Sequence, residues 1–320
     1  MHRDTSHRYG EEALVTVDGA SATGSQTLDG AIAEAIEQHW QLGKDASVRR
    51  FGRGMNSTTW LVSTATHTWG AKAVPAPAAA QFDAGLTVAV RLEAAGLLAG
   101  APCPTMAGAV SVPVAGHQLA LMRHVAGRQL NCADQEEQRA WGATLARAHA
   151  LLQTSPVPLG VQTWHWVDPE APHLDVEPWI RPAVQAAVER MHALECGMPL
   201  THGILHADPA PEAFLVNGEG QVAIIDWGGV THGPLLYDIA SAQLYAGSPS
   251  TFAVLLAGYL EVLPAIRQEL CALPDFLRFR WAVQADYFAR RIRCHDLTGL
   301  ASQSENEVGL LAAGRFFANT

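Results

Sequence analysis

Two aspartates, Asp208 and Asp226, stand in the chain at a spacing that suits phosphoryl transfer. Asp208 ends the triplet His206-Ala-Asp, and Asp226 directly follows the apolar run of residues 222–225. In that chemistry a carboxylate on a short loop accepts the proton of the attacking hydroxyl, and a second one at a strand end binds the metal ion on the nucleotide phosphates. One aspartate alone is equally well explained as a turn or helix cap. The ordered pair predicts Asp208 as the catalytic base and Asp226 as a metal ligand.

The segment Gly233-Pro-Leu-Leu-Tyr-Asp238 follows, and with it the chain resembles the aminoglycoside phosphotransferase and choline kinase-like family. The pattern of that family is HGDxxxxN, then a strand ending in IDW or IDF, then GPxxxDLA. The residues that match it are His206, Asp208, Asp226, Trp227, Gly233, Pro234, Asp238 and Ala240. The resemblance implies an α+β, two-lobed protein kinase-like fold, with an antiparallel sheet in a small N-lobe and a larger, mainly helical C-lobe. It also implies that Asp238 braces the catalytic loop and that His206 packs and hydrogen-bonds within it.

The metal site departs from the family pattern at Ala213, which stands where the family has an asparagine that contacts the metal. An alanine cannot ligate a metal. Glu212 is the expected substitute, because magnesium accepts carboxylate oxygen readily. Asn217 is a weaker substitute, since Asn217-Gly-Glu-Gly is the turn of a predicted hairpin between two apolar runs. Ala207, in place of the family's glycine, is a milder departure.

A glycine-containing segment near the start of the chain predicts a phosphate-binding loop, and its candidate residues are Gly52, Gly54, Asn56 and Ser57. Glycines let backbone N–H groups approach nucleotide phosphates, and a lysine on the following strand neutralises phosphate oxygens. Most surface lysines only solvate a strand edge. Lys72 has apolar neighbours and the right interval after the loop, which favours the phosphate role.

In the family this lysine pairs with a glutamate of the next helix, but Val90 occupies the corresponding position here. Glu93, about one helical turn away, and Asp83, nearer the helix start, are the possible replacements. We expect Glu93. A later strand that runs into Gly127 resembles the hinge between the lobes, where main-chain groups meet the adenine; its candidates are Met122, Arg123, His124 and Val125. An ordinary core strand is the alternative.

Helical periodicity dominates the second half of the chain, over residues 141–152, 179–194, 238–245, 251–262 and 274–293. In the family the late helices help to line the acceptor pocket, so the resemblance implies acceptor contacts for Gln284, Asp286 and Tyr287. A scaffold helix with a charged outer face is the alternative. Residues 28–42 predict a further helix, capped by Thr27. The expected organisation is a flexible segment (1–26), an N-lobe (27–122) and a C-lobe (123–320).

Composition and charge limit the classes of binding partner and the cellular compartment that we expect. A formal net charge of −10 argues against a general nucleic-acid binder. No apolar run reaches the length that crosses a bilayer, and the N-terminus lacks the apolar core of a signal peptide. The five cysteines are scattered, which favours reduced thiols. We therefore expect a cytoplasmic protein, a monomer or a homodimer, with no nucleic-acid or membrane partner.

These expectations converge on a magnesium-requiring phosphotransferase that uses ATP or GTP and a small-molecule hydroxyl acceptor. The expected acceptor is an antibiotic such as an aminoglycoside, or another secondary metabolite. Three alternatives stay open: a kinase-like protein that binds a nucleotide or a partner without turnover, a kinase acting on peptide Ser or Thr hydroxyls, and a metal-dependent hydrolase. The hydrolase leaves the glycine-containing loop and Lys72 unexplained.

Overall fold

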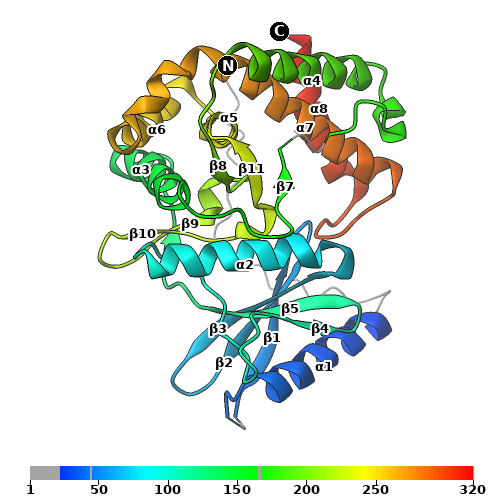
Figure 1. The fold of residues 1–320 in the computed structure, drawn as a ribbon. Helices are drawn as coiled ribbons and strands as arrows, with labels where there is room; N and C mark the ends of the chain where they lie inside the picture. Colours follow the sequence, from blue (N-terminus) through cyan, green and yellow to red (C-terminus); the bar gives the residue numbers. More distant parts are fainter. Residues whose placement is uncertain (1–21, 44, 165–166, 320) are drawn as a thin grey trace.

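The computed structural model describes residues 22–43, 45–164 and 167–319. It has two lobes, with a β-sheet and helix α1 in the first and most of the helices in the second (Figure 1). Helix α2 lies between them. The expected α+β, kinase-like division into a sheet lobe and a helical lobe is confirmed.

The N-lobe sheet is antiparallel, with strand order β1-β2-β3-β5-β4. Its strands are β1 (Ser47–Arg53), β2 (Thr58–Ser63), β3 (Thr68–Pro75), β4 (Val112–Val114) and β5 (His117–Arg123). Helices α1 (Ala22–His39) and α2 (Ala79–Ala94) pack on opposite faces of it, because side chains alternate along a strand. Ala71 and Ala73 of β3 pack with α1, whereas Val74 packs with Phe82 of α2.

Helix α1 differs from its predicted limits. It begins at Ala22, so Thr27 lies inside the helix and residues 22–26 are helical instead of belonging to a flexible lead. The helix is anchored by apolar residues further along, such as Ile32 and Ile36, which are completely or almost completely buried. The polar composition of residues 22–26 did not predict this first turn. Residues 1–21 lie outside the described part.

The C-lobe contains the predicted helices and one more. They are α3 (Gln135–Leu152), α4 (Ile180–Gly197), α5 (Leu236–Ala246), α6 (Pro249–Val262), α7 (Leu273–Arg293) and the unpredicted α8 (Gln303–Ala318). Helices α3 and α6 touch backbone to backbone: a Cβ on Gly142 would lie 1.9 Å from the carbonyl oxygen of Leu255, and one on Gly258 would lie 2.1 Å from that of Arg139. Two small sheets complete the lobe, β6 (Arg128–Gln129) with β9 (Phe214–Val216) and β10 (Val222–Ile224), and β7 (Gln162–Thr163) with β8 (His202–Leu205) and β11 (Thr231–Pro234).

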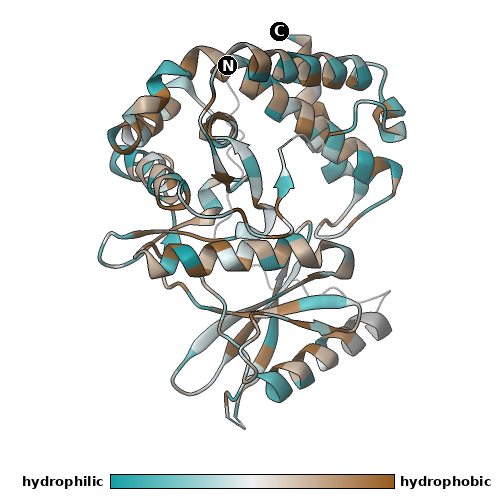
Figure 2. Cartoon of the chain, in the orientation of Figure 1, coloured by the Kyte–Doolittle hydropathy of each residue, from teal (hydrophilic) through white to brown (hydrophobic). Residues whose placement is uncertain are grey.

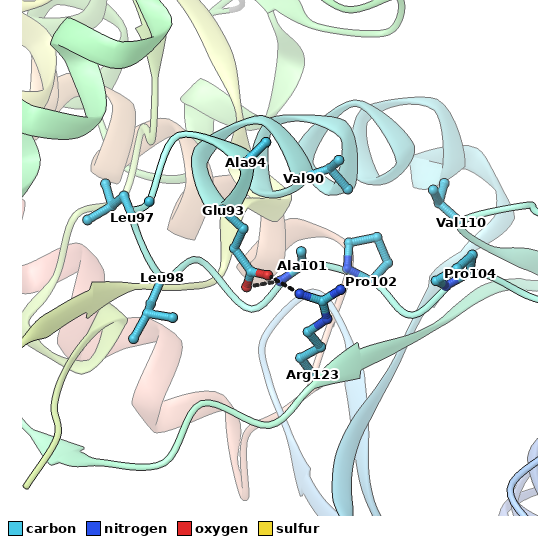
Figure 3. A pocket seen from close by; sticks show the side chains of 11 residues that line it. Val90, Glu93, Ala94, Leu97, Leu98, Ala101, Pro102, Pro104, Val110 and Arg123 are labelled. Carbon is cyan, nitrogen blue, oxygen red and sulfur yellow. Dashed lines mark hydrogen bonds and ion pairs between the residues drawn. The ribbon is translucent and has the colours of Figure 1, made fainter.

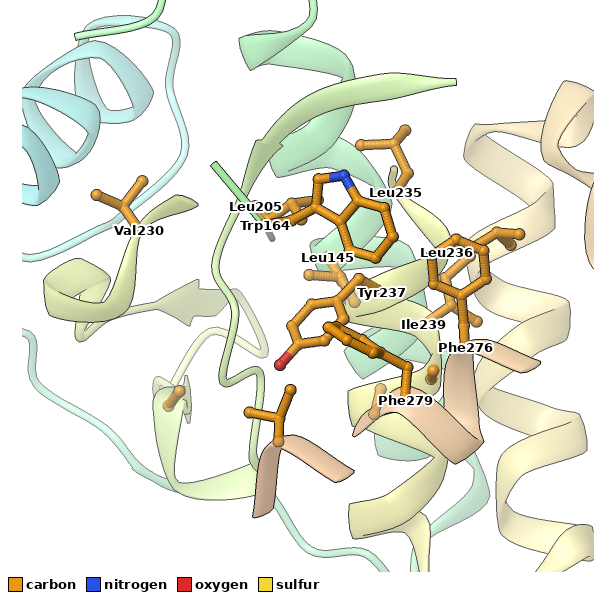
Figure 4. Close-up of a cluster of buried hydrophobic side chains, with 14 of the residues drawn as sticks. Leu145, Trp164, Leu205, Val230, Leu235, Leu236, Tyr237, Ile239, Phe276 and Phe279 are labelled. Carbon is orange, nitrogen blue, oxygen red and sulfur yellow. The ribbon is translucent and has the colours of Figure 1, made fainter. Parts of the chain in front are cut away.

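The core of the C-lobe contains a group of large aromatic side chains. Trp164, Tyr237, Phe276 and Phe279 pack there with leucines of β8 and α5 (Figure 4). The rings of Trp164 and Phe279 meet edge to face, with centroids 5.3 Å apart, a favourable aromatic geometry. Phe276 and Phe279 thereby pack helix α7 against β8, which precedes Asp208, and against α5.

Helix α2 belongs to both lobes. Its residues Ala84, Val88 and Leu92 share one buried cluster with the C-lobe helices. The other side of the helix packs on the sheet. In Figure 2 the helices carry both hydrophobic and hydrophilic residues, as expected of helices with one face in a core. Among the described helices none is both long and apolar enough to span a membrane.

Candidate active site

The predicted catalytic loop, which carries Asp208, starts at the end of β8 and is held by Asp238 of α5. The buried carboxylate of Asp238 accepts hydrogen bonds from the backbone N–H groups of His206 (2.7 Å) and Ala207 (2.8 Å). His149 of α3 lies 3.0 Å from the same carboxylate and 2.8 Å from the hydroxyl of Tyr259. Ala207 has a φ of 70°, a left-handed conformation that glycine adopts more easily. The hydrogen bonds that Asp238 accepts from His206 and Ala207 offset the strain of this conformation for an alanine.

His206 is buried within the loop and does not face the solvent. Its Nε2 lies 2.8 Å from the carbonyl oxygen of Ile225, which makes Nε2–H the donor, and its ring meets Trp227 edge-on. Its Nδ1 is buried and has no hydrogen-bond partner among the residues that the structure describes. His206 therefore ties the catalytic loop to the segment that carries Asp226.

Asp208 is exposed at the end of this loop, and two residues from distant helices hold one of its oxygens. Tyr245 of α5 donates a hydrogen bond to Oδ1, and Nη2 of Arg280, from α7, lies 3.3 Å from the same atom. Arg280 also donates to the Tyr245 hydroxyl at 2.9 Å. Burial, and then the nearby carboxylate, raise the pKa of Tyr245, so it remains a donor. Asp208 is thus oriented through Oδ1, while Oδ2 has no protein donor among the described residues.

Asp226 follows β10 and makes an ion pair with Lys72 of β3, which joins the two lobes. Asp226 has a φ of 65°, a conformation in which aspartate is found more often than most residues. The surrounding protein raises the pKa of its carboxyl, but the Lys72 ammonium more than offsets this and leaves the pKa below its ordinary value. Asp226 is therefore a carboxylate at neutral pH, available to a cation.

Glu212 lies in the same acidic neighbourhood. Partial burial, together with the carboxylates of Asp208 and Asp226, raises its pKa. The described residues hold no group of three or more His, Cys, Asp or Glu side chains arranged for a metal. A magnesium ion at Asp226 and Glu212 would need further oxygens, and nucleotide phosphates supply these in phosphoryl-transfer sites. The carboxylate donors fit magnesium.

Ala213, at the family's asparagine position, and Asn217, the weaker substitute, both have structural places. Ala213 is buried in the loop before β9. The side chain of Asn217 accepts hydrogen bonds from the backbone N–H groups of Glu219 and Gln221 and belongs to the β9–β10 turn.

Glu93 does not pair with Lys72. Its carboxylate accepts a hydrogen bond from the backbone N–H of Ala101 (2.8 Å) and pairs with Arg123 (2.9 Å) at the edge of a cavity of about 590 Å³ (Figure 3). Asp83 is also engaged elsewhere, by the hydroxyl of Ser111 at 2.6 Å. These are the only acidic residues of α2, and the buried face of that helix is apolar. Lys72 consequently forms its ion pair with Asp226.

The predicted phosphate loop is the turn between β1 and β2. The N–H of Gly54 donates to the carbonyl of Ser57 at 2.8 Å, which closes the turn, and Gly52 lies at an irregularity in the β1–β2 pairing. Asn56 accepts a hydrogen bond from the hydroxyl of Tyr287, 3.1 Å away on α7. A C-lobe helix therefore contacts the loop.

The predicted hinge residues fall at the end of β5 and just after it. Met122 pairs with Gly70 of β3, and the N–H of Arg123 donates to the carbonyl of Ala101 at 3.0 Å. His124 and Val125 follow the strand, where the chain passes into the C-lobe. Contacts of these four residues with a nucleotide base stay a prediction.

The three predicted acceptor residues of α7 have protein partners. The side-chain amide of Gln284 donates to the carbonyl of Gly309 in α8 at 3.1 Å, and Asp286 lies 2.6 Å from Nε2 of His173. Tyr287 contacts the phosphate loop. The α7 residue that reaches Asp208 is Arg280. The sequence contained one signal for Arg280. It is a charged residue on the buried face of α7, among Phe276, Phe279 and Val283.

Comparison with known proteins identifies the family and the fold of the chain. The family model described as "Phosphotransferase enzyme family" matches residues 47–273. A homoserine kinase of Rhizobium johnstonii is 27% identical over 201 residues, which span 58% of this chain and 62% of that enzyme. A microcompartment-associated aminopropanol kinase superposes with a TM-score of 0.70 at 19% identity, over 89% of this chain and 94% of that one. An amicoumacin kinase superposes with a TM-score of 0.69 at 14% identity, over 91% and 93%.

The family match covers both lobes and every residue of the Asp208, Asp226 and Lys72 arrangement. The solved structures share the fold across almost the whole chain. On this evidence the chain belongs to the phosphotransferase enzyme family and has its kinase-like fold.

Proposed function

We propose that this chain is a kinase that transfers the γ-phosphoryl group of ATP to a hydroxyl of a small molecule. The observation that carries the proposal is the ion pair of Lys72 with Asp226 across the two lobes, beside the loop that carries Asp208. Lys72 would bind phosphate, Asp226 would bind the metal, and the pair would place both near the base Asp208. GTP is the alternative nucleotide.

Each residue has a distinct task in this proposal. Lys72 and residues 52–57 bind the nucleotide phosphates, and Asp208 orients the acceptor hydroxyl and accepts its proton. Tyr245 and Arg280 hold Oδ1 of Asp208, so that Oδ2 receives the proton. Catalysis then comes mainly from positioning and from compensation of charge.

Magnesium is the metal that the donor set supports, held by Asp226 and Glu212. When bound, it would compensate the negative charge of the nucleotide phosphates. Glu212 takes the place of the family's asparagine here. Burial, and then the carboxylates of Asp208 and Asp226, raise its pKa, and a cation held by these carboxylates would lower it.

Two acceptor classes remain, and Arg280 favours one of them. Likeness to the homoserine kinase supports a small hydroxylated amino acid, whereas likeness to the amicoumacin kinase supports an antibiotic. The nearly buried guanidinium of Arg280 lies 3.3 Å from the predicted base. Within the acidic neighbourhood of Asp208, Asp226 and Glu212, it is the charge that would attract a carboxylate of the acceptor. Homoserine is therefore the first acceptor to test, and an aminoglycoside the second.

The nucleotide site can be tested by covalent labelling, because the chain has only two lysines, Lys44 and Lys72. An adenosine reagent with an amine-reactive group at the phosphate position should modify Lys72, and MgATP should prevent this. Lys44 is the internal control for non-specific reaction. Equal modification of both lysines, unaffected by MgATP, would move the assignment to a kinase-like protein without nucleotide turnover.

The acceptor can be tested by phosphate transfer from radiolabelled ATP to homoserine, to 3-aminopropan-1-ol, which lacks the carboxylate, and to kanamycin. We expect homoserine to have the highest kcat/KM. Asp208→Asn should lower kcat by about 10²- to 10⁴-fold and leave the affinity for MgATP unchanged, because the base acts on the acceptor. Preferential phosphorylation of kanamycin would reverse the order of the two acceptor classes.

A further inference from the structure

The phosphate loop contacts the C-terminal part of the chain, more than 200 residues away in sequence. The contact is made by the end of α7 and by residues 294–302, which connect α7 to α8; we call residues 294–302 the strap. Three independent contacts join the loop to these elements, through Arg291, Tyr287 and Gly299.

Arg291 of α7 is the centre of the arrangement. Its side chain is 1% exposed, and its Nη1 donates to the carbonyl of Met55, at the tip of the loop, at 3.1 Å. The same guanidinium binds the strap through the carboxylate of Asp296 (3.1 Å) and the carbonyl of Thr298 (2.6 Å). Its Nε donates to Asn306 of α8 at 2.9 Å. One buried arginine thus ties the loop, the strap and α8 together.

The strap is itself folded to fit the loop. The carboxylate of Asp296 accepts a hydrogen bond from the N–H of Thr298 at 2.9 Å, and Gly299 has a φ of 75°. A Cβ on Gly299 would lie 2.6 Å from the carbonyl oxygen of Gly54 and 2.8 Å from the nitrogen of Met55. The strap and loop backbones are therefore in direct contact, and only glycine permits it.

Tyr287 adds a side-chain contact on the same side. Its hydroxyl donates to Asn56 at 3.1 Å, and its ring lies 5.6 Å from the Arg291 guanidinium. These contacts hold the loop from the side of the C-lobe.

We propose that Arg291, Tyr287 and the strap are a positioning element that holds the phosphate loop and thereby sets the affinity for the nucleotide phosphates. The proposal rests on the proposed function, because the ligand of the loop is the nucleotide. Preorganisation is the physical reason: a loop already held in one conformation loses less conformational entropy when it binds phosphates. Arg291 acts through the loop backbone and is not itself in contact with the reacting groups.

Gly299→Ala is the sharpest test, and Gly220→Ala is its matched control. Both glycines have positive φ, 75° and 77°, but a Cβ on Gly220, in the β9–β10 turn, meets nothing within 4 Å. Both variants therefore carry the same kind of backbone strain, and only Gly299→Ala pushes on the loop. Tyr287→Phe is a milder second variant that removes only the hydroxyl.

Two measurements decide the proposal. Hydrogen–deuterium exchange of peptides covering residues 52–57, in the protein without nucleotide, should be faster in Gly299→Ala than in wild type and unchanged in Gly220→Ala. The KM for MgATP should rise on the order of tenfold in Gly299→Ala, while the KM for the acceptor stays within twofold of wild type. Tyr287→Phe should change both readouts in the same direction and less.

The outcomes separate this proposal from the proposed function. Unchanged loop exchange and unchanged KM for MgATP in Gly299→Ala would overturn the positioning role. An equal change in Gly220→Ala would overturn it too, because general destabilisation would then explain the effect. If wild-type protein binds neither MgATP nor MgGTP, the proposed function fails and the nucleotide half of this proposal fails with it; the exchange data still decide whether the strap holds the loop.

Discussion

The guanidinium of Arg280 and the carboxylate of Asp208 lie 3.3 Å apart, with Tyr245 bonded to both. These three residues come from α7, the catalytic loop and α5. Burial lowers the pKa of Arg280, but the neighbouring oxygens more than offset this and keep the group cationic. The predicted base is therefore oriented by a positive charge and a phenol hydroxyl.

Tyr245→Phe should lower kcat by about tenfold, because a hydrogen bond to a charged group contributes about 1.5–3 kcal/mol and here orients the base. The KM for MgATP should not change, since Tyr245 does not contact the phosphate loop or Lys72 in the described structure. Steady-state kinetics at saturating acceptor gives both values. An unchanged kcat would mean that the loop brace at Asp238 orients Asp208 sufficiently.

Arg280→Lys and Arg280→Met separate charge from geometry. If the charge of Arg280 selects the acceptor, Arg280→Lys should keep most of the preference for homoserine over 3-aminopropan-1-ol, and Arg280→Met should lose it. The ratio of the two kcat/KM values is the measurement, and circular dichroism controls for folding. A preference that survives in Arg280→Met would assign acceptor selection to other residues.

Lys72→Met should change the acid dependence of stability. Lys72 lowers the pKa of Asp226, so this carboxylate stabilises the fold above its unfolded pKa, and the contribution is lost as pH falls through the folded pKa. Without Lys72, the ammonium no longer lowers this pKa, so the stabilisation is lost at neutral pH, whereas in acid it is absent from both proteins. The difference in Tm between wild type and Lys72→Met should therefore be largest near pH 7 and shrink below about pH 4.

A Tm difference that stays constant from pH 7 to pH 3 would contradict the ion pair as the cause. The measurement is made without nucleotide or magnesium, which would add their own linkage to pH. Asp226→Asn is the matched variant, because it removes the titrating group and keeps Lys72. Its Tm should show a smaller acid dependence than wild type over the same range.

Glu212→Gln should raise the magnesium concentration needed for half-maximal activity. A carboxyl with a raised pKa must lose its proton to bind a cation, so the magnesium requirement of wild type should fall as pH increases through that pKa. The glutamine variant should need more magnesium and show a flatter pH dependence. Titration with magnesium at several pH values measures this, with Glu219→Gln, in the exposed turn, as the control. An unchanged requirement in Glu212→Gln would exclude Glu212 as a ligand.

The sequence predicted the elements whose signals are local. The β9–β10 hairpin, five C-lobe helices and the loop bearing Asp208 are each encoded within a few residues, by a turn or by periodicity. The contact of Lys72 with Asp226 replaced the expected Glu93 pair, because Glu93 lies at the end of α2 and turns to Arg123. Sequence spacing predicts which helix carries Glu93. The direction in which Glu93 points depends on how α2 packs against both lobes.

Long-range contacts were not predictable in this way. Tyr245 and Arg280 are 37 and 72 residues from Asp208, and the crossing of α5 and α7 brings them there. Helix α8 was missed because its two internal glycines lower helix propensity. In the fold Gly309 lets Phe288 pack against α8, since a Cβ there would lie 2.3 Å from the ring and the ring would have to move. Tertiary packing outweighs local propensity at this helix.

The last prediction concerns Gly85, where α2 meets the segment after Asp226. A Cβ on Gly85 would lie 2.2 Å from the carbonyl oxygen of Trp227. Since this atom is backbone, the helix and the Asp226 segment must move apart in Gly85→Ala. We expect a loss of about 1–3 kcal/mol in unfolding free energy, as for other insertions into a packed contact. Displacement of Asp226 from Lys72 should also weaken magnesium-dependent ATP binding.

Gly30→Ala is the control for this variant, because Gly30 lies in α1, where a Cβ would meet nothing within 4 Å. The same chemical change should there increase stability by about 0.5–1 kcal/mol through helix propensity. Urea unfolding gives both free energies, and calorimetric titration with MgATP gives the affinities. Opposite signs of the two stability changes, with weaker binding in Gly85→Ala alone, would establish that the α2 contact positions the Asp226 segment. Gly85→Ala with wild-type stability and affinity would show that the two elements separate without effect on the site.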